Sequence, residues 1–363
     1  MELIKLDSFQ NQMNEIVEKT IEEWQGKIPD NELSDKIGKA LADTSKDIAQ
    51  VVFGELLKTK DDTLKHNRSL SDSFCERNKL RWGSAFDLLE MLIEINVETV
   101  NSFKFTYDES ADGDEEIVFD VAVKLHAKAI HIALEGLCLM EGGYADGAHA
   151  RWRALHEISV VTIFLLKHGI DAVNRYLDHG QIDAYKAMKQ CNKFADRTNF
   201  KSFDEDEMNE AKKLYDDVLD KYGNDFKLSN AWASPFLNNN PKRPTFADLE
   251  KSVDLDMIRP DYTWASQNVH PTVRGLYVRL GVPDSESLKL LATRSNYGMT
   301  DPGHAIALSL TKTLSAFLNI KSNFDTMIWV QVALETSDLI GEEFLKISTQ
   351  QEKEMLDEKI QQA

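Results

Sequence analysis

The amino-acid sequence predicts an all-α protein: a multi-helix bundle around a central antiparallel helical hairpin, with a long aromatic loop. Its 363 residues include only 8 prolines and 17 glycines, so few positions interrupt regular structure. Long stretches place apolar residues at helical spacing, and no series of alternating strands occurs. Because 42% of the residues are hydrophobic, the chain can build a substantial core, in one large domain or two.

The N-terminal region, residues 1–112, is expected to hold three helices, each with an apolar stripe at helical spacing. Their expected spans are 7–26, 33–58 and 84–103. The charged stretch from Lys60 to Arg81 is expected to begin as a loop. The acidic sequence DESADGDEE at 108–116 predicts either a domain boundary or an exposed loop within one domain.

The main helical domain, residues 113–349, is expected to begin with the central hairpin. Its first helix should run from about residue 116 to 140 and stop at Gly142-Gly143. Asp146 is a good N-cap for the second helix, and Gly169 is a good C-terminal stop. Because the connection is short, the two helices should pack antiparallel.

Four more helices are expected after the hairpin, at 170–197, 205–222, 301–318 and 323–347. The second of these has a narrow apolar seam, which suits a two-helix contact at the periphery. Residues 224–271 are rich in Asn, Pro and aromatic residues, with one short helix expected after Thr245. Such a loop is either a lid or binding loop, or an ordered segment held by its aromatic side chains. A polar tail, 350–363, is expected to fray.

Composition restricts the location and the partners. A formal net charge of −19 disfavours nucleic acid and anionic membranes unless charge is segregated locally. No stretch approaches the roughly 18 apolar residues of a membrane span, and no signal peptide precedes the helices, so a cytoplasmic location without membrane contact is expected. The 3 cysteines form no CxxC pair. Because metal-binding and nucleotide-binding motifs are also missing, we expect neither a metal nor a cofactor.

Charged side chains lead directly into the apolar run of the hairpin's second helix. Arg153 and His156 share a helical face, and Glu157 lies beside it at i, i+4 from Arg153. An unpaired buried charge costs several kcal/mol, so these groups need partners. They predict either an ion-pair network that fixes helix register or an active site, with Glu157 or His156 as acid or base and Arg153 holding an anion.

The preceding helix supplies the expected partners. In an antiparallel pair that turns near residue 144, Glu135 should lie opposite Arg153, and His131 opposite Glu157. The sequence therefore predicts a polar cluster between the two helices, in which Arg153, His156 and Glu157 point toward the first helix.

Arg151 and His156 fit the pattern Arg-x4-His, which resembles the signature of the HEPN ribonucleases, all-helical proteins common in toxins and phage defence. That resemblance implies a metal-independent attack of an RNA 2′-hydroxyl on its own phosphate, usually across a dimer interface. Five residues along a regular helix correspond to a rotation of about 140°, so Arg151 and His156 would not share a face. Arg153 is the partner of His156 on the same face.

A basic stripe at helical spacing offers one local exception to the acidic composition. It either holds an RNA phosphate backbone or forms a solvated helix face. Its members are Lys186, Lys189, Lys193 and Arg197.

Two further histidines are candidate ligand-binding residues. His270 ends the aromatic loop, and His304 falls in the first turn after Asp301-Pro302, where a helix N-terminus favours a bound anion. Either could approach the hairpin cluster and complete a site, or each could be structural.

The run Arg153-Ala-Leu-His-Glu157, with the apolar segment after it, resembles the Arg-x-Leu-x-Glu core of DUF5677, a bacterial family of uncharacterised helical proteins. Val269-His270-Pro271 and residues 297–304 are similar to its second and third blocks, and the resemblance covers about 84–320. It implies a bacterial or mobile-element protein with an all-α fold, and supplies no established activity. Because the family is distantly similar to abortive-infection and HEPN-type proteins, it implies a role in phage defence.

Three functions remain open on the sequence. The first is an interaction or effector protein that acts by self-association, as a homo-oligomer, or by binding another protein. The second is a metal-independent endoribonuclease that uses Arg151 or Arg153 with His156. The third is a small-molecule hydrolase or transferase built on Glu157, Arg153 and His270 under the aromatic loop.

Overall fold

The computed structural model describes residues 9–108, 113–199, 201–283 and 290–362. Within these ranges all regular structure is α-helix or 3-10 helix, which confirms the all-α prediction. The chain forms two compact units, residues 1–76 and 77–363. Each unit is described by itself.

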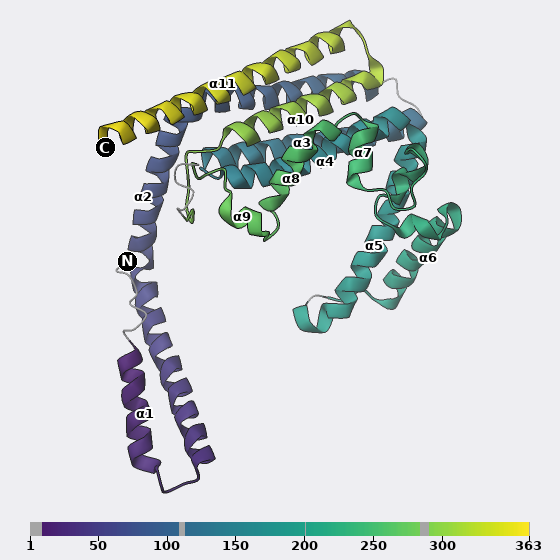
Figure 1. The fold of residues 1–363 in the computed structure, drawn as a ribbon. Coiled ribbons are helices and arrows are strands. Elements are labelled where there is room, and N and C mark those ends of the chain that lie inside the picture. The colour runs from purple at the N-terminus through teal and green to yellow at the C-terminus, as the bar shows by residue number, and fades with distance from the viewer. Residues whose placement is uncertain (1–8, 109–112, 200, 284–289, 363) are drawn as a thin grey trace. The chain divides into compact units, whose positions relative to one another are not determined.

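The first unit is a helical hairpin of α1 (Gln10–Trp24) and the first part of α2 (Asp30–Asp108) (Figure 1). In the turn between them Gly26 has a φ of +77°, which glycine adopts without steric cost. The ammonium of Lys36 lies 4.1 Å from the centre of the Trp24 ring. This cation–π contact joins the two helices at the turn.

The stretch expected to begin as a loop, Lys60 to Arg81, is helical and lies within α2. It contains no proline or glycine, and its many Lys, Arg, Asp and Leu residues are compatible with a solvated helix. The prediction of two separate helices at 33–58 and 84–103 was therefore wrong.

The two units divide between Glu76 and Arg77, whereas the sequence offered residues 108–116 either as a boundary or as an exposed loop within one domain. The reason is the burial of the second half of α2. Trp82, Leu89 and Ile93 are fully buried in the larger hydrophobic core of the second unit. Because these side chains need the other helices of that unit to cover them, this half of α2 folds with the main body.

The second unit is built on α3 (Asp114–Glu141) and α4 (Ala145–His168), which run antiparallel and are joined by residues 142–144. Helix α10 (Thr300–Leu318) packs against both, and α11 (Phe324–Gln362) packs against α10 (Figure 1). A Cβ atom at Gly136 would collide with Ile306, and one at Gly303 would collide with Phe344. The rigid Phe344 ring makes glycine necessary at position 303, whereas the end of the flexible Ile306 side chain could move away from a Cβ atom at position 136.

A second hydrophobic cluster joins the C-terminal end of α4 to α5 (Ile170–Thr198) and α6 (Glu205–Tyr222). Two 3-10 helices, η1 (Asn224–Lys227) and η2 (Ala231–Phe236), complete it. Phe164 packs edge-on against Trp232 of η2, with ring centres 5.4 Å apart. These aromatic contacts hold the segment after residue 224 against α4 and α5.

The aromatic segment 224–271 is not one long loop but a chain of short helices. After η1 and η2 come α7 (Phe246–Ser252), η3 (Asp256–Ile258) and α8 (Arg259–Gln267). A capping box between Thr245 and Asp248 starts α7, and Pro260 lies in the first turn of α8. Both α7 and α8 contact α4, so they cover the charged face of the hairpin.

Two shorter elements link the remaining helices: α9 (Val273–Tyr277) and η5 (Asn319–Lys321). The C-terminal tail expected to fray, 350–363, is helical through Gln362 as part of α11. It is rich in Gln, Glu and Lys and has no proline or glycine, so nothing in it stops the helix. No helix of the described ranges is both long and apolar enough to cross a lipid bilayer.

Candidate functional site

His156 lies at the centre of a buried charge network. Its side chain is 1% exposed, and its Nε2 lies 2.8 Å from Oε1 of Glu250, which is completely buried. The second oxygen of Glu250 forms an ion pair with Arg259, the first residue of α8. The partners of His156 therefore come from α7 and α8, not from α3.

Burial sets the protonation of this network. Burial, together with the charges of Arg259 and Lys312, lowers the pKa of His156 to about 4. The imidazole is consequently neutral at neutral pH. Burial raises the pKa of Glu250, while the adjacent Arg259 opposes that rise. The network is thus stabilised as a neutral ring beside a carboxylate–guanidinium pair.

A second, half-exposed pair lies beside the buried one. The Tyr262 hydroxyl donates to Oε1 of Glu157 at 2.5 Å, and Nη2 of Arg153 lies 3.1 Å from the same oxygen. The Arg153 guanidinium also lies over the Tyr262 ring, 4.8 Å from its centre. Burial and the bond to Glu157 raise the pKa of Tyr262 to about 12, so the phenol keeps its proton as a donor.

The pairing expected across the hairpin was wrong in register. Glu135 pairs with Arg151, not Arg153. His131 is 74% exposed, and its Nε2 lies 3.6 Å from Glu135 instead of contacting Glu157. The connection is centred on residue 143 rather than 144, because α3 ends at Glu141 and α4 begins at Ala145. That difference moves each facing position by two residues.

The predicted direction of the cluster was also wrong. His156 is buried, as expected, but Arg153 and Glu157 pair with each other and with Tyr262. Sequence reasoning missed Glu250 and Arg259. The only local signal for Glu250 is its position in a short capped helix, and helical spacing cannot place such a helix beside α4.

The other candidate residues do not join this network. Arg151 and His156 have separate partners, on α3 and α7 respectively, so the Arg-x4-His pair is not brought together. His270 is exposed after the end of α8. His304 packs against Gly341 of α11, and burial lowers its pKa. In the described part of the chain neither histidine has a recorded bond or ring contact with the cluster.

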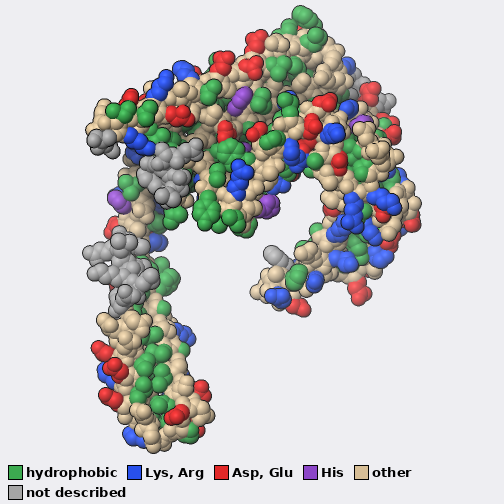
Figure 2. All heavy atoms as spheres, viewed as in Figure 1, with side chains coloured by type: hydrophobic (Ala, Val, Ile, Leu, Met, Phe, Trp, Pro, Cys, Tyr) green, Lys and Arg blue, Asp and Glu red, His purple; other side chains and the backbone are tan. Residues whose placement is uncertain are grey.

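The basic stripe lies exposed on α5, as its spacing predicted. Lys186 donates to the carbonyl of Lys227 at 2.7 Å, and Lys189 lies over the Tyr185 ring. Figure 2 shows basic side chains over α5 and α6, with acidic ones among them. Binding of RNA to this stripe stays a prediction.

A different feature gathers at the N-terminal end of α11. Large apolar side chains are exposed there within two turns of helix: Phe324, Met327, Ile328 and Trp329, here named the α11 patch. Figure 2 shows hydrophobic side chains at this end of α11, with acidic ones next to them along the helix. In the sequence they read as part of a helical stripe. The core-facing positions of α11 are filled by Thr326, Ala333 and Ile340, which leaves the patch residues exposed.

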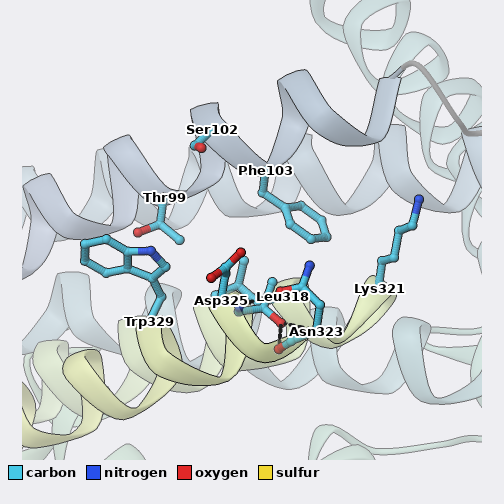
Figure 3. Close-up of a pocket in the computed structure, with 9 residues that line it drawn as sticks. Thr99, Ser102, Phe103, Leu318, Lys321, Asn323, Asp325 and Trp329 are labelled. Atoms are coloured by element: carbon cyan, nitrogen blue, oxygen red, sulfur yellow. Dashed lines mark hydrogen bonds between the residues drawn. The ribbon is translucent and has the colours of Figure 1, made fainter.

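A cavity of about 190 Å³ opens beside this patch (Figure 3). The second half of α2 forms one wall, and η5 with the first turns of α11 forms the other. The residues that line it are Thr99, Ser102, Phe103, Leu318, Lys321, Asn323, Asp325, Thr326 and Trp329. Nowhere in the described ranges are three His, Cys, Asp or Glu side chains arranged to hold a metal ion.

One family model matches the segment of the chain that carries the charge network. Residues 119–287 match the model of a family of unknown function, DUF5677, which confirms the resemblance seen in the sequence. The matched segment includes His156, Glu157, Glu250 and Arg259, whereas α10 and α11 lie outside it. Neither the curated proteins nor the solved structures contain a match to the chain.

Proposed function

We propose that this chain, whose residues 119–287 match a family of unknown function, is a protein-interaction module that acts by self-association or by binding another protein. The α11 patch carries the proposal. Phe324 is 77% exposed and Met327 65%, with Ile328 and Trp329 beside them. Exposed apolar patches of this kind mark interaction sites, and aromatic residues and methionine are enriched at interfaces.

The charge network supports a structural rather than a catalytic role for the hairpin. His156 and Glu250 are closed off from solvent, and their polar atoms contact each other. A general base must come within hydrogen-bond reach of a substrate proton. A buried, neutral imidazole that bonds a buried carboxylate instead fixes the position of α7 on α4. We therefore do not propose the ribonuclease or the hydrolase.

The test is sedimentation velocity over a range of concentrations, combined with a photo-crosslinking residue at position 327. We expect either a concentration-dependent dimer or a discrete cross-linked partner that co-purifies in a fixed ratio. The double variant Phe324→Ser/Met327→Ser should abolish the association, while Leu214→Ser, at an exposed apolar position on α6, should not. A strictly monomeric protein with no discrete adduct at position 327 would overturn the proposal.

The setting we propose for this interaction is phage defence, which rests on the family resemblance alone. Cells that produce the chain should then give fewer plaques than cells that lack it. The Phe324→Ser/Met327→Ser variant should restore the plaque number if the α11 patch carries the function. Equal plaque numbers with and without the wild-type chain, across a panel of unrelated phages, would remove phage defence from the proposal.

A further inference from the structure

The cavity beside the α11 patch combines two aromatic walls with one carboxylate. Figure 3 shows the Asp325 carboxylate between Trp329 of α11 and Phe103 of α2. Within the described residues Asp325 has no hydrogen bond or ion pair. Lys321 is the one cation among the described lining residues, and in Figure 3 its ammonium points away from Asp325. A carboxylate between aromatic faces is the arrangement that binds an organic cation.

We propose that this cavity receives an arginine side chain of a partner protein, whose neighbouring apolar residues cover the α11 patch. This inference rests on the proposed function and deepens it by naming the chemistry of the partner. A guanidinium can stack on Trp329 or Phe103 while its N–H groups donate to Asp325. Arginine held in such a pocket at the edge of an apolar contact is a typical hot spot of an interface.

The size of the cavity favours a side chain over a free ligand. Pockets that bind drug-sized molecules measure roughly 300–1,000 Å³. At about 190 Å³, this cavity holds a head group and part of its alkyl stem. The remainder of the ligand must then lie outside, on the α11 patch next to it.

Charge along α11 favours a basic partner over a second copy of the same surface. Beyond the patch, the exposed face of α11 carries Glu335, Asp338 and Glu342. A two-fold contact centred on this acidic stretch would bring these carboxylates against those of the second copy. Like charges that face each other across an interface disfavour association. A protein segment with arginine among leucines, isoleucines or similar residues complements both the patch and the acidic face.

The experiment follows the indole of Trp329 in the full chain labelled with 5-fluorotryptophan. Its ¹⁹F resonance is assigned with Trp329→Phe. The probes are N-acetyl-arginine methylamide and its uncharged isostere, N-acetyl-citrulline methylamide. We expect the arginine probe to shift the resonance saturably and the citrulline probe to bind at least about tenfold more weakly, the loss of one charge-assisted contact.

Matched variants separate the pocket from general acidity. Asp325→Asn should weaken the arginine probe about tenfold, whereas Asp357→Asn, the same change at an exposed position farther along α11, should leave binding unchanged. No shift with the arginine probe, equal binding of citrulline, or equal loss in both variants would overturn the proposal.

A second arm distinguishes a protein segment from a free cation. The probes are the capped peptide Leu-Arg-Leu and agmatine, a small guanidinium compound. The peptide should bind more tightly than the capped arginine, and Phe324→Ser/Met327→Ser should remove only that gain. Agmatine binding as tightly as the peptide would overturn the assignment to a protein. If cross-linking at position 327 persists unchanged in Asp325→Asn, the interaction module stands and the arginine pocket fails.

Discussion

At the scale of single residues, the second unit contains histidines that burial keeps neutral. Burial lowers the pKa of His126 to about 3, and that of His149 to about 4. The His126 ring packs on Phe317, with centres 5.4 Å apart, and neither of its nitrogens has a hydrogen-bond partner among the described residues. Such groups resist protonation only while the fold is intact, so they link stability to pH.

His126 should make the protein less stable in acid. Its folded-state pKa is depressed below the unfolded value of about 6.5, so its contribution is complete above pH 6.5 and is lost as pH falls toward 3. Between pH 7 and 5 the His126 side chain binds a proton in the unfolded state but not in the folded state. This difference lowers the free energy of unfolding by about 2 kcal/mol. Urea unfolding of the wild type and of His126→Leu at both pH values measures this difference.

Between pH 7 and 5, the free energy of unfolding of His126→Leu should fall by about 2 kcal/mol less than that of the wild type. His131→Gln, at a mostly exposed position, is the control. Parallel losses in the wild type and in His126→Leu would show that His126 does not resist protonation in the fold.

The charge network makes a second prediction at this scale. Glu250→Gln leaves His156 and Arg259 without their common anion and should lower the free energy of unfolding by about 2 kcal/mol. This loss is smaller than the cost of leaving a fully buried charge unpaired, because the Arg259 side chain is 32% exposed and can be hydrated. Glu157→Gln, at a half-exposed pair, should cost less than about 1 kcal/mol. Equal losses in urea unfolding would contradict this ranking.

At the scale of elements, the turn of the α3–α4 hairpin is held by residues far along the chain. Asp146 does not cap its own helix, which begins at Ala145. Its carboxylate instead accepts hydrogen bonds from the backbone amide of Leu280 at 2.9 Å and from Nε of Arg279 at 3.1 Å. Ser295 donates its amide to the Gly143 carbonyl at 2.9 Å. The turn therefore organises the segment that leads into α10.

Asp146→Ala should release the backbone around residue 280 from the hairpin. We expect amides of residues 279–282 to exchange hydrogen faster, by more than about tenfold, because the Asp146 carboxylate fixes this stretch. Stability should fall by about 1–2 kcal/mol, the cost of leaving Arg279 and the amide without their acceptor. Hydrogen exchange followed by mass spectrometry checks this. Asp120→Ala, on the exposed face of α3, is the control. Similar exchange rates at residues 279–282 in both variants would contradict the prediction.

At the scale of the whole molecule, the chain consists of two compact units that share α2. Every residue of both hydrophobic clusters lies between Trp82 and Ile347, within the second unit. Among the residues that the structure describes, the first unit, a hairpin of α1 and part of α2, contributes none to either cluster. Folding of the second unit should therefore not require the first.

A fragment of residues 77–363 should fold by itself. We expect its near-ultraviolet circular dichroism to reproduce that of the full chain, because Trp82, Trp152 and Trp232 keep their buried surroundings. Its thermal midpoint should lie within about 5 °C of the full chain's main transition. A fragment that lacks a cooperative transition would show that residues 1–76 support the main core.

The sequence by itself determined the helices, because helical spacing and stop signals are local. Gly169 ends α4 as expected, and the hairpin of α3 and α4 forms where its glycines placed the turn. The length of α2 was not foreseen, since a charged stretch without proline or glycine is compatible with either loop or helix. The extent of a solvated helix depends on what lies at its two ends.

Only the tertiary structure decided which charged groups meet. The partner of His156 is Glu250, 94 residues away, and the arrangement of α7 on α4 follows from hydrophobic packing over many residues. Because the centre of the turn lies one residue earlier than expected, Glu135 forms its ion pair with Arg151 rather than with Arg153. Helix formation is governed by neighbours within a few residues, whereas pairing across helices depends on rotations and offsets that the whole core fixes at once.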